Sequence, residues 1–264
     1  MKFFEISGRS HLKLEILELL ANNPKTLSEL SENLNKTKST LSFQMKPLID
    51  LGLIRKIRRG RNVYYETTEL GAIVKDRIVE LLKLKDVLTN AGDFFRNHDL
   101  SPIPKVLLNE IHMLRGCKVF VKDNPYELHP EWMKIVKGSA WIYGLSSVYH
   151  RDFPELFKNL AKEREVKIIL TENVFGKVMR ECKEQLSEFL KYGRFFVCKN
   201  AKLAFIVAEK GFTLSLYNLN GTYDSLRVLI CKTDEAVKWG LKLFEHYLTH
   251  STDKIKIDWN INSA

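Results

Sequence analysis

Hydrophobic positions near the start of the chain recur at helical spacing. The first run predicts a helix with a broad buried face, formed by Leu12, Leu14, Ile16, Leu17, Leu19 and Leu20. A second helix is predicted where Leu27, Leu30 and Leu34 follow one another at i, i+3 and i+7. Thr26 and Glu29 stand at capping-box spacing at its start, so the threonine hydroxyl can accept a bond from the third helical amide. The turn "NKT" then leads into a third helix.

The third helix is predicted to open near Thr37 or Ser39 and to have two unlike faces. The inward face is apolar and holds Leu41, Met45, Leu48 and Ile49. The opposite face presents Ser39, Ser42, Phe43 and Lys46. Two helices joined by a short turn are typical of a helix-turn-helix, whose second helix enters the major groove. Pro47 is expected to bend this helix or to shift its start, because proline lacks a backbone N–H.

The next residues predict a two-stranded hairpin with strands at 53–57 and 63–67. Gly60, in the turn "RRGR", permits the positive φ of a tight hairpin. Its tip presents Arg58, Arg59 and Arg61, as the wing of a winged helix would. We therefore expect the helix to read the major groove while the hairpin grips phosphate or the minor groove. The predicted DNA-contacting residues are Lys36, Lys38, Ser39, Thr40, Ser42, Phe43, Gln44, Lys46, Arg58, Arg59, Arg61 and Asn62.

Positive charge is concentrated in the same segment. Residues 36–61 hold eight Lys or Arg residues and one acid, so they carry +7 of the chain's formal +10. A basic balance favours polyanionic partners such as DNA. The alternative interpretation is a small helical bundle with a solvated basic loop. The order of the elements and the placement of the charge favour the winged helix.

A continuous helical pattern follows at 71–97, and its apolar stripe is broader than a lone surface helix needs. We expect this helix to pack against its twin in a homodimer. The two prolines of "LSPIPK" end it and mark a linker. The predicted organisation is a winged helix at 1–70, a linker and dimerisation helix at 71–100, an α/β effector domain at 101–250 and a tail at 251–264.

Seven short β-rich runs predict strands in the third segment: "CKVFV", "AWIYGL", "VKIILT", "RFFVC", "LAFIVA", "FTLSLY" and "LRVLI". Helical patterns are found at 147–163, 173–193 and 233–250. Strands alternating with helices favour an α/β or α+β domain with a mixed sheet. No helix interrupts 195–217, so we expect an antiparallel meander there, at one side of the sheet.

The first 70 residues, with "KSTLSFQMKPLIDLGLIRK", resemble winged-helix regulators of the ArsR and MarR type. Metal sensing by the ArsR route is not expected, because these residues contain no Cys and a single His, His11. The stretches "FTLSLYNLNGTYDSLRVLI" and "DEAVKWGLKLFEHY" resemble the C-terminal domain of archaeal methanogenesis regulatory proteins. That resemblance implies a sensor or effector module, with an α/β fold somewhat like that of phospholipase D.

A ligand pocket is expected where the strand "WIYG" ends, because ligands of open α/β sheets lie beyond the carboxyl ends of strands. The candidate residues are Trp141, Tyr143, Ser146, Ser147, Thr171, Tyr223 and Asp224. The alternative is ordinary strand-to-helix turn chemistry, and for Tyr223 and Asp224 a structural turn after Asn220-Gly221.

The function predicted from these patterns is a DNA-binding transcriptional regulator that senses an unknown effector or partner. An RNA-binding or protein-bridging winged helix is the alternative. A phosphodiesterase on a phospholipase-D-like core is disfavoured, because that chemistry uses His-x-Lys followed by Asp, and none of His112, His129, His150, His246 and His250 begins such a motif. We therefore expect no catalytic site, no metal and no cofactor.

The thiols and the hydropathy of the chain bear on where it resides. Four widely spaced cysteines, without CxxC pairs, predict reduced thiols. No apolar run approaches the length of a membrane span. Together these features predict a cytoplasmic protein.

Overall fold

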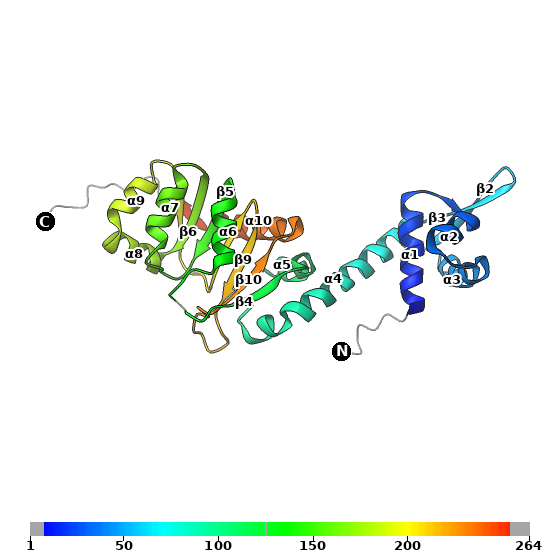
Figure 1. Cartoon of the computed structure of the whole chain (residues 1–264), viewed down its shortest axis with the longest axis horizontal. Coiled ribbons are helices and arrows are strands. Elements are labelled where there is room, and N and C mark those ends of the chain that lie inside the picture. The colour runs from blue at the N-terminus through cyan, green and yellow to red at the C-terminus, as the bar shows by residue number, and fades with distance from the viewer. Residues whose placement is uncertain (1–7, 125, 254–264) are drawn as a thin grey trace. The chain divides into compact units, whose positions relative to one another are not determined.

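The computed structural model describes residues 8–124 and 126–253, and it divides the chain into two compact units, Met1–Lys85 and Asp86–Ala264 (Figure 1). None of the helices in the described part of the chain combines the length and hydropathy that a bilayer crossing requires.

The first unit holds helices and a small antiparallel sheet of order β1-β3-β2. Its elements are α1 (Gly8–Asn22), β1 (Lys25–Thr26), α2 (Leu27–Leu34), α3 (Lys38–Asp50), β2 (Ile54–Arg59), β3 (Asn62–Thr67) and the first part of α4 (Glu69–Asn97). The three predicted helices and the hairpin are therefore confirmed. So is the capping box at Thr26, whose hydroxyl accepts from the Glu29 amide at 3.3 Å.

A compact aliphatic core joins α1, α2 and α3 to the base of the hairpin. Ile16, Leu30 and Leu41 are fully buried in it. Burial of a side chain of this size stabilises a fold by about 1.5–3 kcal/mol. The inward face predicted for the third helix is confirmed, because Leu41, Met45 and Leu48 all belong to this core.

The start of α4 is fastened to the base of the hairpin within this unit. The Thr68 hydroxyl donates to the carbonyl of Gly52 at 2.7 Å and accepts from the amide of Gly71 at 3.0 Å. A side chain at Gly71 would collide with the carbonyl oxygen of Leu53. Glycine is therefore required where the helix leaves the hairpin.

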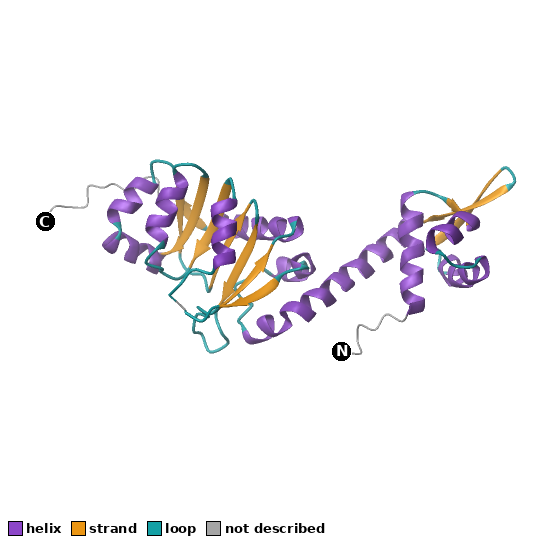
Figure 2. Cartoon of the chain, viewed as in Figure 1, coloured by secondary structure: helices purple, strands orange, loops and turns teal. Residues whose placement is uncertain are grey.

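The second unit is built on one eight-stranded mixed sheet, as Figure 2 shows. Its strands are β4 (Lys118–Val121), β5 (Trp141–Ser146), β6 (Glu165–Thr171), β7 (Arg194–Cys198), β8 (Leu203–Ala208), β9 (Gly211–Leu216), β10 (Arg227–Cys231) and β11 (Ser251–Asp253). The order is β11-β7-β6-β5-β8-β9-β10-β4, with β5, β6 and β7 parallel. All seven predicted strands are present, and the expected mixed α/β architecture is confirmed.

Helices cover both faces of this sheet. One face carries α6 (Pro130–Gly138), α7 (Phe153–Ala161), α8 (Glu172–Glu181) and α9 (Lys183–Phe189). The other carries the end of α4, α5 (Lys105–Asn109), the 3₁₀ helix η2 (Ile111–Leu114) and α10 (Asp234–Thr249). The helix predicted at 173–193 is divided at Cys182 into α8 and α9. The pattern at 147–163 gives a shorter helix that starts only at Phe153.

The predicted meander is only partly right. Strands β8, β9 and β10 do form an antiparallel meander. However, β7 lies on the opposite side of β5 and β6, between β6 and β11. The reason is that the α8–α9 segment returns the chain for parallel pairing with β6, so β7 extends the parallel ladder. The first residues of the predicted tail, Ser251–Asp253, form β11 against β7, and the rest of that tail lies outside the described residues.

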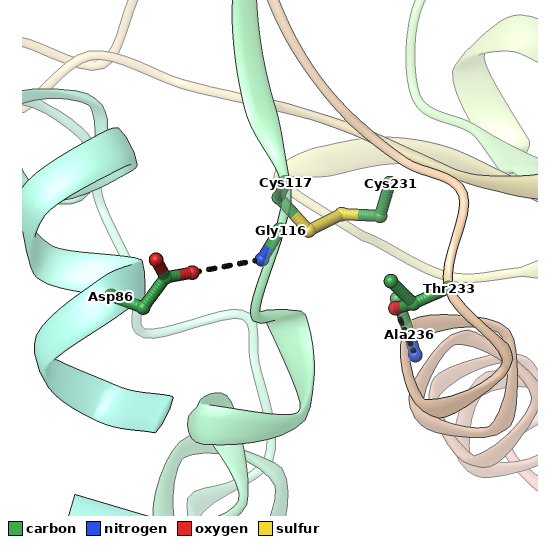
Figure 3. The surroundings of a disulfide bond; sticks show 6 residues. All are labelled: Asp86, Gly116, Cys117, Cys231, Thr233 and Ala236. Carbon is green, nitrogen blue, oxygen red and sulfur yellow. Dashed lines mark hydrogen bonds between the residues drawn. A yellow bond between two sulfur atoms is a disulfide. The ribbon is translucent and has the colours of Figure 1, made fainter. Parts of the chain in front are cut away.

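The expectation of reduced thiols is wrong for two of the four cysteines. Cys117 and Cys231 form a disulfide, shown in Figure 3. They come together because Lys118 pairs with Ile230 across β4 and β10, which places their neighbours opposite each other. The adjoining amide of Gly116 donates to Asp86 Oδ2 on α4 at 3.1 Å. Cys182 and Cys198 are buried free thiols.

The disulfide closes a long loop, because its cysteines are 114 residues apart. We expect Cys117→Ser to lower the free energy of unfolding of the second unit by about 2–5 kcal/mol, through the entropy that the open chain regains. Urea unfolding followed by tryptophan fluorescence measures this, because all four tryptophans lie in residues 86–264.

Reduction supplies the matched control for this prediction. Dithiothreitol should destabilise the wild type by the same amount and leave the variant unchanged. A wild type that is insensitive to reductant, with thiol titration showing the bond opened, would contradict the prediction.

Candidate nucleic-acid interface and effector region

The turn between α2 and α3 is set by local hydrogen bonds. Asn35 adopts the left-handed conformation at φ 49° and ends α2. The Ser31 hydroxyl then donates to the carbonyl of Lys36 at 2.6 Å. Thr37 is the N-cap of α3, and its hydroxyl accepts from the amide of Thr40 at 3.2 Å. The helix therefore begins at Lys38, with exposed hydroxyls at its N-terminus.

The outer face of α3 is exposed, as the spacing predicted. Ser39, Ser42, Phe43 and Lys46 are all exposed, and Phe43 retains 69% of its surface. Lys36, Lys38 and Thr40 are exposed as well. Gln44 departs from the predicted set, because only 7% of its surface is exposed and it lies on the inner side of the helix with Leu41 and Leu48. Gln44 is therefore unsuited to contact with a nucleic acid.

Pro47 does not interrupt α3. The helix starts at its capped position and continues through Pro47 to Asp50. The carbonyl of Pro47 accepts from the amide of Leu51 at 3.0 Å, so the last turn stays closed. The expected shift of the helix start is therefore not seen.

The hairpin β2–β3 is in regular antiparallel register from Ile54–Thr67 to Arg59–Asn62. Gly60 has φ +60°, as the tight turn requires. The exposed residues Arg58, Arg59, Arg61 and Asn62 surround this turn. These four predicted residues therefore gather at one tip.

Two tyrosines on β3 support the basic side chains of β2. The Arg59 guanidinium lies 5.5 Å from the centre of the Tyr64 ring, and the Lys56 ammonium lies 6.0 Å from that of Tyr65. Such cation–π contacts hold a charge in place while leaving it accessible. The prediction omitted these tyrosines, although the alternation in "NVYYET" indicated side chains on both faces of the strand.

Arg55 differs from the basic residues at the tip. Its guanidinium donates to the carboxylate of Glu66 on β3, and this hydrogen bond raises the pKa of Arg55. A guanidinium that already donates to a carboxylate is expected to bind a phosphate less strongly than one that is hydrated. The charge of the wing is therefore concentrated beyond Arg55, around Gly60.

The residues predicted to bind a ligand do not converge. Trp141 and Tyr143 point to the face covered by α10, where Tyr143 stacks on Phe244 at 5.1 Å between ring centres. The Tyr143 hydroxyl donates to Glu165 Oε1 at 2.9 Å. Thr171 is buried at the N-cap position of α8. Of the seven candidates, Ser146 and Tyr223 line a common cavity, which has a volume of about 370 Å³.

The hydrogen bonds of Asp224 indicate that it stabilises a turn. Its carboxylate accepts from the amides of Leu226 and Arg227 at 2.9 and 3.1 Å. Oδ2 also lies 3.1 Å from Nε2 of the buried His98. This pattern favours the structural-turn interpretation of 220–224, where Gly221 has φ +85°. No group of three or more His, Cys, Asp or Glu placed to hold a metal occurs in the described ranges.

Comparison with known families divides the chain in two. Residues 10–56 match the model described as "Bacterial regulatory protein, arsR family". Residues 125–250 match "Methanogenesis regulatory protein FilR1, middle domain". The first unit is thus similar to an ArsR-family helix-turn-helix, and the second unit is similar to a FilR1 middle domain. The ArsR-family match includes most of α1, all of α2 and α3, and the beginning of the wing.

Individual relatives are consistent with this division. The chain is 27% identical over 263 residues to the methanogenesis regulatory protein FilR1 of Methanothrix harundinacea (strain 6Ac), covering 96% of this chain and 58% of that relative. The chain thus spans little more than half the length of the curated relative. The residues that match the FilR1 middle domain contain most of the mixed sheet, from β5 to β10, and leave out β4 and β11.

Solved structures that resemble this chain were also found, among them TrmBL2 and BldR. TrmBL2, described as an archaeal chromatin protein, is 13% identical and covers 96% of each chain with a TM-score of 0.44. The regulator BldR from Sulfolobus solfataricus is 25% identical over 42% of this chain and 76% of its own, with a TM-score of 0.29.

Proposed function

We propose that this chain is a DNA-binding transcriptional regulator. The observation that carries the proposal is that the outer face of α3 and the wing tip present exposed basic and hydroxyl side chains within one small unit. The match to an ArsR-family regulatory protein and the similarity to a methanogenesis regulatory protein support it.

In this proposal α3 enters the major groove and the wing neutralises phosphate. The short side chains Ser39 and Ser42 allow the helix to approach base edges, where hydroxyls can donate or accept. Phe43 offers an apolar contact of the kind that thymine methyl groups accept. Arg58, Arg59 and Arg61 supply charge that releases counterions when they meet phosphates.

In this proposal each predicted segment of the chain has its own function. Residues 1–70 bind DNA, 71–100 link and dimerise, and 101–250 sense an effector. An effector changes DNA affinity only through its different affinity for two states of the dimer. The cytoplasmic location, the absence of catalysis and the phospholipase-D-like character of the effector domain belong to this proposal. An RNA-binding or bridging role is its alternative.

Dimerisation is proposed from the exposed apolar residues of α4. Leu70, Ile73 and Leu81 are 52%, 58% and 53% exposed. At 3.6 residues per turn their positions fall within an arc of about 80°, which makes one stripe. A second copy of α4 would cover it, and a dimer would place two recognition helices about 34 Å apart on a pseudo-palindromic site.

The wing is tested by the triple substitution Arg58→Ala, Arg59→Ala and Arg61→Ala. We expect weaker binding to duplex from the chain's own upstream region, and a salt dependence shallower by up to about 2.7 in log–log slope, because three phosphate contacts are lost. Fluorescence anisotropy at several salt concentrations measures both quantities.

Charge and ligand controls accompany this titration. The triple substitution Lys118→Ala, Lys199→Ala and Lys202→Ala removes the same charge from exposed positions of the second unit and should leave the slope unchanged. Equal slopes in the wing variant and the wild type would contradict the proposed role of the wing. Competition by RNA at equal strength would favour the alternative.

The dimer is tested by Ile73→Glu combined with Leu81→Glu. We expect the wild type to be a dimer at micromolar concentration and the variant to be a monomer, because two carboxylates in the apolar stripe would have to be desolvated. Light scattering coupled to gel filtration gives the mass. Asp76→Ser, an exposed α4 position outside the stripe, is the control. A monomeric wild type would contradict the proposal.

A further inference from the structure

The 370 Å³ cavity lies on the face of the large sheet that α6 and α7 cover. Strands β5, β8, β9 and β10 form its floor, and loop residues in 122–124, 126–129 and 147–152 close its sides. All these segments belong to the second unit. A volume of this size falls within the range of small-molecule sites.

The cavity exists because the floor is made of small residues. Along β9, Thr213 and Ser215 point to this face, whereas Phe212, Leu214 and Leu216 fill the core on the other face. Ala204 on β8 pairs directly with Ser215. A strand covered on both faces ordinarily carries large apolar residues on each side. The small side chains leave space that the core does not use.

The wall opposite the sheet is aromatic. Trp132 of α6 stacks on Phe153 of α7 with 5.6 Å between ring centres, and Phe157 meets both rings edge-on. Tyr149 lines the same wall, and its hydroxyl lies 3.3 Å from the Cys182 sulfur. Packed rings of this kind offer a flat apolar surface to a planar or branched group.

The polar groups of the cavity favour an anion. Lys122 and Arg227 line it together with His129 and His150, and none of its described lining residues is Asp or Glu. Arg227 has a carboxylate neighbour in Asp224, whose Oδ2 lies 3.6 Å from the Arg227 Nε. Oδ1 of Asp224 accepts two backbone amides, and Oδ2 also lies 3.1 Å from Nε2 of His98, so Arg227 shares this carboxylate with several other groups.

Burial favours the binding of an anion at the cationic side of the cavity. It lowers the pKa of Lys122, whose ammonium donates to the carbonyl of Glu127 at 2.8 Å. A desolvated ammonium is stabilised by a bound anion. Burial also raises the pKa of Tyr223 to about 12, so its phenol remains a neutral hydrogen-bond donor.

We propose that this cavity binds a small organic anion with an aromatic or branched apolar body. The anionic group would lie at Lys122 and Arg227, and the apolar body would lie between the aromatic wall and the floor at Ala204 and Ser215. This site overlaps the pocket predicted at the end of β5, and of the seven residues predicted there it includes Ser146 and Tyr223. It does not depend on whether the first unit binds DNA.

Two fluorescent probes test the proposal, because they share an aromatic body and differ in charge. 8-Anilinonaphthalene-1-sulfonate is an anion, and N-phenyl-1-naphthylamine lacks its sulfonate. We expect the full chain to bind both at one saturable site, with the anion the tighter. Ser215→Leu fills the floor and should weaken both by about tenfold or more. Arg227→Gln should weaken the sulfonate about tenfold and leave the uncharged probe unchanged.

Lys118→Gln is the matched control, because Lys118 is an exposed residue of neighbouring β4 that does not line the cavity. It should change neither affinity. Circular dichroism and tryptophan fluorescence check that each variant is folded, and Ala204→Leu replaces Ser215→Leu if that variant is not. Non-saturable binding, or affinities unchanged in a folded floor variant, would overturn the site. Equal losses of both probes in Arg227→Gln would overturn its anion selectivity.

Discussion

The burial of one stripe of α3 is the constraint on which the candidate interface depends. A helix advances about 100° per residue, so fixing Leu41, Met45 and Leu48 in the core turns Ser42 and Lys46 outward. The aliphatic core of α1 and α2 supplies the surface against which that stripe packs. Without this packing, α3 would no longer hold its outer face in one orientation, and the base of the hairpin would lose contacts with the core. The residues of α3 that are buried in the core therefore determine which of its side chains face a nucleic acid.

A comparable rule operates in the large sheet. Because successive strand residues alternate between faces, one strand can pack a full core on one side and leave space on the other. Strand β9 does this with Phe212 and Leu214 against Thr213 and Ser215. The same alternation separates Tyr143, which stacks under α10, from Gly144 at the cavity. Two adjacent residues of β5 therefore lie on opposite faces of the sheet.

Elements that depend on interactions within a few residues could be predicted from the sequence. Caps such as Thr26 and Thr37, the positive φ of Gly60 and the β-branched runs each act within a few residues, and these elements were predicted correctly. Features that join distant segments were missed. The disulfide links Cys117 to Cys231, and the place of β7 depends on its pairing with β6 rather than on its short connection to β8.

Most of the cavity lining was not predicted, for the same reason, since it comes from several separate segments that only the sheet brings together. Two signals were nevertheless present in the sequence. The alternation of Thr213 and Ser215 with large residues in "FTLSL" is unusual for a strand buried on both faces. Pro130 at the first turn of α6, followed by Trp132, Ile135 and Val136, carried the signature of a helix that the prediction omitted.

The central claim is that the outer face of α3 and the wing tip form the surface that meets duplex DNA. Hydrogen exchange of the full chain, with and without a duplex from its own upstream region, tests this claim most directly. The account predicts slower exchange in peptides that cover residues 36–46 and 55–63, and no comparable slowing with a scrambled duplex at physiological salt. Unchanged exchange in both segments while the duplex is bound, with protection confined to residues 86–253, would contradict it.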